Sequence, residues 1–202
     1  METVLEAQFS TAIDARLRWI NPPPRWRAGE NGRGLILETD AATDFWQGTH
    51  YGFRVDNGHV LAMELVGDFT VTTQLSFRAV HQYDQAGLII RKDADCWIKT
   101  SVEHELEGPA QLGVVVTSHG FSDWSLQNFP SGQTQVCLRL SKRAQDLTAE
   151  WKMPTASGWT LMRVAHWHAP AEAPVWAGLY ACSPKGAGFQ AEFFSLQITR
   201  PE

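Results

Sequence analysis

The stretch that decides the fold is residues 83–103, YDQAGLIIRKDADCWIKTSVE. Its pattern is typical of a β-hairpin, with arms at 85–91 and 96–103 and a turn at 92–95. Side chains in a strand alternate between two faces. The face that suits a core carries Leu88, Ile90, Ile98, Thr100 and Val102. The opposite face carries Gln85, Gly87, Arg91, Trp97, Lys99, Ser101 and Glu103. This mixture of tryptophan, charges and amide indicates either a binding surface or a buried polar network.

Other segments alternate in the same way. Residues 69–77 turn Phe69, Val71, Leu75 and Phe77 to one side, and residues 135–141 do the same with Val136, Leu138 and Leu140. Such strands recur about every ten residues, with almost no helical periodicity, which predicts an all-β fold, an antiparallel two-sheet sandwich. We expect one domain over residues 1–202. Residues 1–18 would be an N-terminal extension that packs on it and holds a short helix or a first strand.

Composition narrows the classes of partner. The chain has 202 residues and a formal net charge of −5, which disfavours nucleic acid and anionic membranes because their phosphates attract basic patches. No segment approaches the roughly 20 apolar residues of a membrane helix. The chain starts without an apolar signal segment, and its three cysteines form no CxxC motif. We therefore expect a cytoplasmic protein with free thiols.

A series of motifs in order resembles a known family. The motifs are TDFWQGTHYGF (43–53), DNGH (56–59), GDFTV (67–71), YDQAGLIIR (83–91), CWIKTSVE (96–103), VVVTS (114–118) with SDWS (122–125), and YACSP (180–184). Together they are similar to the domain-of-unknown-function family 1349 over residues 19–199. That family includes a yeast protein described as a regulator of enolase. The resemblance implies a jelly roll like that of the concanavalin A-like lectins and glucanases, with one concave sheet. Related modules lie at the C-terminal ends of some glycosidases.

The polar face of the central hairpin is the first candidate site. Arg91 and Lys99 would hold a sugar hydroxyl or an anionic group, and Glu103 and Gln85 would exchange hydrogen bonds with hydroxyls. Trp97 would stack on an apolar ring face. Mixed polar and aromatic linings are typical of ligand sites. The alternative is a structural ion network of Arg91, Lys99 and Glu103.

A second cluster would form the rim of the concave face. It comprises Asp44, Trp46, His50 and Tyr51 in the aromatic-rich segment. The alternative is a loop whose aspartate bonds its own backbone and whose rings pack on the core. Further expected rim residues are Tyr83 and Asp84 before the hairpin, and Ser122, Asp123 and Trp124.

The sequence assigns no catalytic residue, metal or cofactor. Retaining glucanases of this fold carry ExDxxE on one strand, which brings two carboxyl groups to one face. Glu103 and Glu105 are the nearest match, and no third acid completes the pattern. His166 and His168 would share a strand face as a pair of metal ligands, without a third ligand at a supporting spacing.

The leading hypothesis is a non-catalytic binding protein for a carbohydrate or a related polyhydroxylated metabolite on the concave sheet. The expected partner is then a saccharide or another small polar ligand. One alternative is a regulatory module of sugar metabolism whose partner is a metabolic enzyme. The other alternative is a glycoside-acting enzyme with an atypical acid pair.

Overall fold

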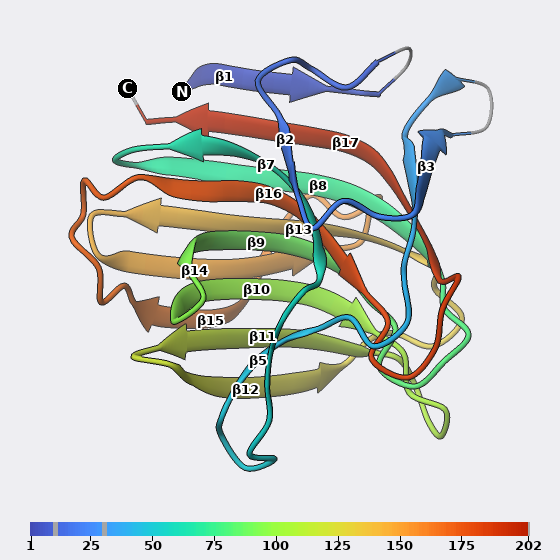
Figure 1. The fold of residues 1–202 in the computed structure, drawn as a ribbon. Coiled ribbons are helices and arrows are strands. Elements are labelled where there is room, and N and C mark those ends of the chain that lie inside the picture. The colour runs from blue at the N-terminus through green and yellow to red at the C-terminus, as the bar shows by residue number, and fades with distance from the viewer. Residues whose placement is uncertain (10–11, 30–31, 202) are drawn as a thin grey trace.

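The computed structural model describes residues 1–9, 12–29 and 32–201, which form two large antiparallel sheets packed as a sandwich (Figure 1). The strands of the larger sheet are β1 (Glu2–Ala7), β3 (Arg25–Ala28), β4 (Leu35–Glu38), β8 (Phe69–Arg78), β13 (Gln135–Arg143), β14 (Asp146–Lys152), β15 (Thr160–His166) and β17 (Gln190–Arg200). They follow the order β15-β14-β13-β8-β17-β4-β3, with β1 also paired to β17. The all-β two-sheet sandwich expected from the alternation is confirmed, and so is the jelly roll that the family resemblance implies.

The second sheet carries the central hairpin. Its strands are β2 (Arg18–Ile20), β7 (His59–Leu65), β9 (Gln85–Asp93), β10 (Cys96–Glu103), β11 (Gln111–Ser118), β12 (Phe121–Asn128) and β16 (Val175–Cys182). They follow the order β12-β11-β10-β9-β16-β7-β2. A short hairpin of β5 (Phe45–Gln47) and β6 (Arg54–Asp56) lies beside β12 (Figure 1).

The register of β9 and β10 sets which side chains face the core. Trp97 lies opposite Arg91, and Glu103 lies opposite Gln85. The apolar positions of the alternation are fully buried between the sheets, namely Leu88, Ile90, Ile98, Val102, Val136, Leu138 and Leu140. Arg91 and Lys99 both turn to the outer face, where they meet Asp56 and Asp44. The predicted division of the hairpin into two faces is confirmed.

The outer face of this sheet has a second apolar cluster of its own. It comprises Phe45, Trp46, Val60, Ala62, Ile89, Trp97, Val115, Tyr180 and Cys182. The segment that holds β5 and β6 folds back over the sheet and covers this cluster. The turn at Gly58 needs glycine, because a Cβ there would lie 2.4 Å from the Phe45 ring. The expected concave surface is therefore a partly covered sheet face.

Two expectations about the rest of the chain are also met by observations. Residues 2–7 form a strand that pairs with β17, which was one of the two alternatives for the N-terminal segment. Cys96, Cys137 and Cys182 are free cysteines.

Among the residues that the structure describes, none belongs to a helix with the length and hydrophobicity needed to cross a membrane.

Candidate functional site

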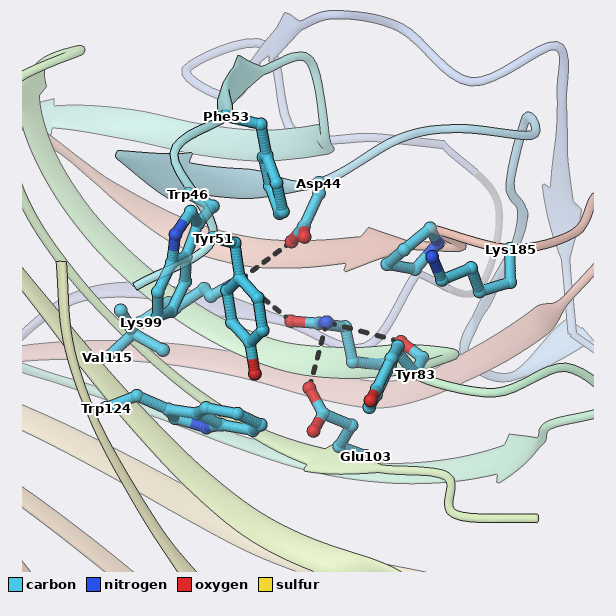
Figure 2. A pocket seen from close by; sticks show the side chains of 12 residues that line it. Asp44, Trp46, Tyr51, Phe53, Tyr83, Lys99, Glu103, Val115, Trp124 and Lys185 are labelled. Atoms are coloured by element: carbon cyan, nitrogen blue, oxygen red, sulfur yellow. Dashed lines mark hydrogen bonds and ion pairs between the residues drawn. The ribbon is translucent and has the colours of Figure 1, made fainter. Parts of the chain in front are cut away.

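A pocket opens on the outer face of the second sheet, between the β5–β6 segment and the loop after β16 (Figure 2). Its volume is about 200 Å³, below the roughly 300–1,000 Å³ of sites for drug-sized ligands, so it suits a small molecule. It is lined by Asp44, Trp46, Tyr51, Phe53, Tyr83, Gln85, Lys99, Glu103, Val115, Trp124, Pro184 and Lys185. We call this the outer-face pocket.

Lys99 is the charged centre of the pocket floor. It projects from β10, and its Nζ donates to Asp44 Oδ1 at 3.1 Å and to Gln85 Oε1 at 2.9 Å. The residue is only 3% exposed. Burial lowers its pKa, but the facing Asp44 carboxylate, with smaller contributions from Cys182 and Glu103, outweighs burial, so the pKa of Lys99 is raised. The ammonium therefore stays charged inside the sheet.

Gln85 links Lys99 to Glu103. Its Oε1 also accepts from the Tyr180 hydroxyl at 3.1 Å. Its Nε2 donates to Glu103 Oε2 at 3.0 Å and to the Tyr83 carbonyl at 3.2 Å (Figure 2). All the hydrogen-bonding groups of this amide are thereby used. Gln85 is thus a fixed part of the floor.

Glu103 is a buried acid with unused hydrogen-bonding capacity. It is 5% exposed, and its Oε1 has no partner among the described residues. Burial raises the pKa of Glu103 to about 8, Lys99 opposes the shift, and Asp44 and Glu105 add to it. A carboxyl group with such a pKa is mostly protonated at neutral pH. Glu103 therefore offers the pocket a neutral acid.

Aromatic rings form the opposite wall. The Trp46 ring lies 5.5 Å from Tyr51 and 6.1 Å from Trp124, both in edge contacts, and Tyr51 stacks on Phe53 at 5.8 Å. Trp46 is anchored because its Nε1 donates to the Thr49 carbonyl at 3.0 Å. Ring faces beside a polar floor are suited to a flat molecule with polar edges.

The structure gathers more than half of the sequence-predicted site residues in one pocket. Gln85, Lys99, Glu103, Trp46 and Tyr83 line the outer-face pocket, and Asp44, Tyr51 and Trp124 from the proposed rim join them. The remaining candidates are not among the lining residues, namely Arg91, Trp97, His50, Asp84, Ser122 and Asp123.

Trp97 lies beneath the pocket and does not line it. It projects to the outer face as expected, yet it is fully buried, 6.0 Å from Phe45 in an edge contact. Its Nε1 donates to the Ala94 carbonyl at 3.0 Å. Because β5 covers Trp97, its ring does not reach the pocket, and Trp46, Tyr51 and Trp124 are among the aromatic residues of the lining.

Arg91 and Asp84 are held by structural contacts. Arg91 pairs with Asp56 of β6 at 2.5 Å, which ties the covering segment to the sheet. Asp84 is fully buried and accepts from the Val80 and His81 amides, each at 2.8 Å, and from the Ser183 hydroxyl. Arg91 therefore forms an ion pair with Asp56, apart from Lys99 and Glu103, with which it was expected to share a network, and Asp84 organises the loop before β9.

His50 and Asp123 do not line the pocket. His50 is exposed at φ 60°, with its ring 4.6 Å from that of Tyr51. Asp123 lies between Ser122 and Trp124 on β12, so the alternation turns it to the other side of the sheet. There it pairs with Arg163 of β15 at 2.8 Å. Asp123 therefore connects the two sheets.

Four lining residues had not been singled out from the sequence. Phe53 lies in the aromatic-rich segment, where the run of rings was a usable signal, and Val115 follows the alternation of β11. Pro184 and Lys185 come from the loop after β16. Nothing in their local sequence indicates that this loop borders the pocket.

Three imidazoles come together away from the pocket. His166 and His168 flank the buried Trp167, with ring centroids 4.6 Å apart, and His119 from the β11–β12 turn lies 5.0 Å from His168. Within the described ranges, no group of three or more His, Cys, Asp or Glu side chains is arranged to hold a metal ion. The cluster is a contact between the end of β15 with the residues after it and the β11–β12 turn.

Comparisons with known proteins agree with this architecture. Residues 19–201 match the model of a family described as "Protein of unknown function (DUF1349)". The chain is 32% identical to "Regulation of enolase protein 1" of Saccharomyces cerevisiae, over 91% of this chain and 89% of that protein. It also superposes on the crystal structure of a functionally unknown protein from S. cerevisiae, with a TM-score of 0.84, 31% identity and coverage of 93% and 98%.

A likeness to glycoside hydrolases concerns the fold alone. The chain superposes on a GH43 protein from Bacillus licheniformis with a TM-score of 0.76 and 15% identity. This match covers 97% of the present chain and 39% of the hydrolase, so the similarity lies in one part of that enzyme.

Proposed function

The chain belongs to the DUF1349 family, and we propose that it is a non-catalytic binding protein that holds a saccharide or related polyhydroxylated metabolite in the outer-face pocket. The observation that carries the proposal is the pairing of a buried polar floor with an aromatic wall in one small pocket. Hydroxyl groups along the ligand edge would meet the polar groups, and its apolar ring face would lie against the aromatic rings.

The floor is costly to maintain for a purely structural purpose. Lys99 and Glu103 are 3% and 5% exposed, and burying charged or unpaired polar groups opposes folding. An ordinary apolar cluster already lies beside them and would serve packing alone. A ligand that uses the spare hydrogen-bonding capacity of Glu103 accounts for the arrangement.

The proposal is tested by titrating the protein with monosaccharides, disaccharides and polyols, and measuring tryptophan fluorescence and heat. Saturable binding without product release is the expected result. Release of product from aryl glycosides would instead favour the enzyme alternative, with Asp44 and Glu103 as the two carboxyl groups in the pocket.

A regulatory function is the second candidate, and it rests on the name of the yeast relative, "Regulation of enolase protein 1". In that case the protein contacts a metabolic enzyme, and the outer-face pocket transmits ligand occupancy to the contact. A pull-down with purified enolase, with and without saccharide, tests this candidate. Retention of enolase with no response of the protein to any saccharide would place regulation ahead of sugar binding.

A further inference from the structure

The hydrogen-bond network of the pocket floor fixes where the proton of Glu103 resides. A lysine ammonium can only donate, so Gln85 must turn its Oε1 to Lys99. The Tyr180 hydroxyl donates to the same oxygen. The Nε2 of Gln85 is then directed to Glu103 Oε2, and because an amide nitrogen only donates, Oε2 must accept. A proton on the neutral carboxyl group therefore belongs on Oε1.

This oxygen is the unused end of the network. Glu103 Oε1 is buried and without a partner in the described part of the chain. A buried polar group that makes no hydrogen bond opposes folding, so such a group calls for an acceptor from outside the chain. The side chain belongs to the pocket lining, which places that acceptor in the pocket (Figure 2).

The surroundings of Glu103 favour the neutral form. Burial is the largest cause of its raised pKa of about 8, and Asp44 and Glu105 raise it further, against Lys99. From β16, Tyr180 and Cys182 face the same interior, and burial raises the pKa of both well above their ordinary values. Tyr51, Tyr83 and Lys185 complete the ionisable lining. Among the lining residues, Lys99 therefore supplies the single buried positive charge, and Asp44 already pairs with it.

The other unused groups of the pocket are mostly donors as well. No hydrogen bond engages the hydroxyls of Tyr51 and Tyr83 or the Lys185 ammonium within the described residues, and all three side chains line the pocket. Asp44 Oδ1 already accepts from Lys99 and from the Phe45 amide. With Glu103 neutral and Asp44 paired to Lys99, Lys185 leaves the pocket with one positive charge. Such a lining suits a ligand group that accepts hydrogen bonds and carries one negative charge.

We propose that the ligand of the outer-face pocket is a sugar acid, whose carboxylate accepts a hydrogen bond from Glu103 Oε1 and is bordered by Tyr51, Tyr83 and Lys185. This inference rests on the proposed function and narrows its ligand class. A carboxylate fits better than a phosphate, because phosphate sites use several cations or an arginine fork and this lining supplies one unpaired ammonium. A hydroxyl fits less well, because it can donate a hydrogen bond to an ionised Glu103 as readily as it accepts one from the neutral acid.

Entry of the carboxylate requires a side chain to move, since Glu103 Oε1 exposes almost no surface. Tyr51 is the lining residue we expect to move, because its side chain is 52% exposed. Figure 2 shows its ring across the pocket with the hydroxyl on the side of Glu103 and Trp124. Rotation of Tyr51 would open the path and bring its hydroxyl to the ligand.

The experiment is calorimetric titration of the wild-type protein and Glu103→Gln at pH 6.5 and pH 9.0. The probes are glucuronate, galacturonate and gluconate, each with a neutral counterpart: methyl glucoside, methyl galactoside and sorbitol. The wild type should bind at least one acid about tenfold more weakly at pH 9.0, because roughly a tenth of Glu103 remains protonated one unit above a pKa of about 8. Glu103→Gln keeps a neutral donor, so its affinity should be the same at both pH values.

Each other outcome is decisive. Equal binding of the neutral counterparts, without a pH effect, would overturn the sugar-acid inference and leave the proposed function standing. An equal loss of acid binding at pH 9.0 in Glu103→Gln would show that another group senses pH, which also overturns it. Tighter binding of glucose 6-phosphate than of any carboxylate would make the ligand a phosphate. If no probe binds either protein, the inference and the proposed function both fail. Thermal melting of both proteins at each pH confirms that they are folded.

Discussion

The ammonium of Lys99 lies 2.9 Å from Oε1 of Gln85, and this contact orients the whole pocket floor. It fixes the amide, the amide fixes the acceptor oxygen of Glu103, and the free oxygen of Glu103 is left for a ligand. Buried hydrogen bonds linked in this way are cooperative, so a substitution at one residue alters the hydrogen bonds of the others.

Replacing Lys99 with methionine should lower the free energy of unfolding by about 2–4 kcal/mol, because it leaves the Asp44 carboxylate without its buried partner. Urea denaturation measures the change. Lys92→Met is the matched control, since Lys92 pairs with Asp93 at the exposed hairpin turn and should contribute no more than about 0.5 kcal/mol. Equal, small effects of both substitutions would contradict a structural role for the Lys99 network.

Replacing Trp124 with alanine should weaken ligand binding about tenfold with a modest loss of stability, because Trp124 is a partly buried wall residue of the pocket. Trp97→Ala should behave differently. It removes a fully buried side chain and should cost about 3–5 kcal/mol of stability. Calorimetric titration and thermal melting on both variants separate the two roles. A selective loss of binding in a stably folded Trp97→Ala protein would contradict the assigned wall.

The stability of the wild type should fall as the pH rises from about 4.5 to about 8. In this interval the folded state keeps a proton on Glu103 that the unfolded state has lost, because burial raises the pKa of Glu103 from 4.5 to about 8. Above pH 8 both states are ionised and this contribution becomes constant. Glu103→Gln should remove the decline and exceed the wild type in stability at pH 9. Urea midpoints at pH 5, 7 and 9 give the comparison, and a wild-type stability that rises over this range would refute it.

Replacing Asp123 with asparagine should leave ligand binding unchanged. Its carboxylate is 73% exposed and pairs with Arg163 on the side of the sheet away from the pocket, so the loss of stability should stay within about 1 kcal/mol. Titration and melting of Asp123→Asn test both statements. A clear loss of affinity would show that Asp123 belongs to the rim of the site.

The alternation of the central hairpin was enough to predict its two faces. Leu88, Ile90 and Ile98 are buried between the sheets, and Lys99 and Glu103 share the outer face. Period-two alternation depends only on strand geometry, so it can be followed residue by residue along the sequence. It is also the rule that separates Trp124 from Asp123, and treating SDWS as a single rim segment missed that division.

The contents of the pocket could not be predicted from local patterns. Trp97 is covered by Phe45, which is about fifty positions earlier in the chain, and Lys185 reaches the pocket from the loop after β16. Both placements depend on how distant segments pack over the sheet. Likewise, Glu103 is neutral because those distant segments bury it and raise its pKa. The sequence of its own strand does not indicate that burial.

The central claim, a ligand site in the outer-face pocket, is tested most directly by NMR of the tryptophan indole N–H groups during titration with the neutral and acidic sugars. The chain has nine tryptophans, and the signals can be assigned with single Trp→Phe substitutions. The account predicts that the Trp46 and Trp124 signals shift in a saturable way, whereas the signal of Trp167, buried in the core between the sheets, stays in place. Saturable shifts confined to other tryptophans, or none with any sugar, would contradict it.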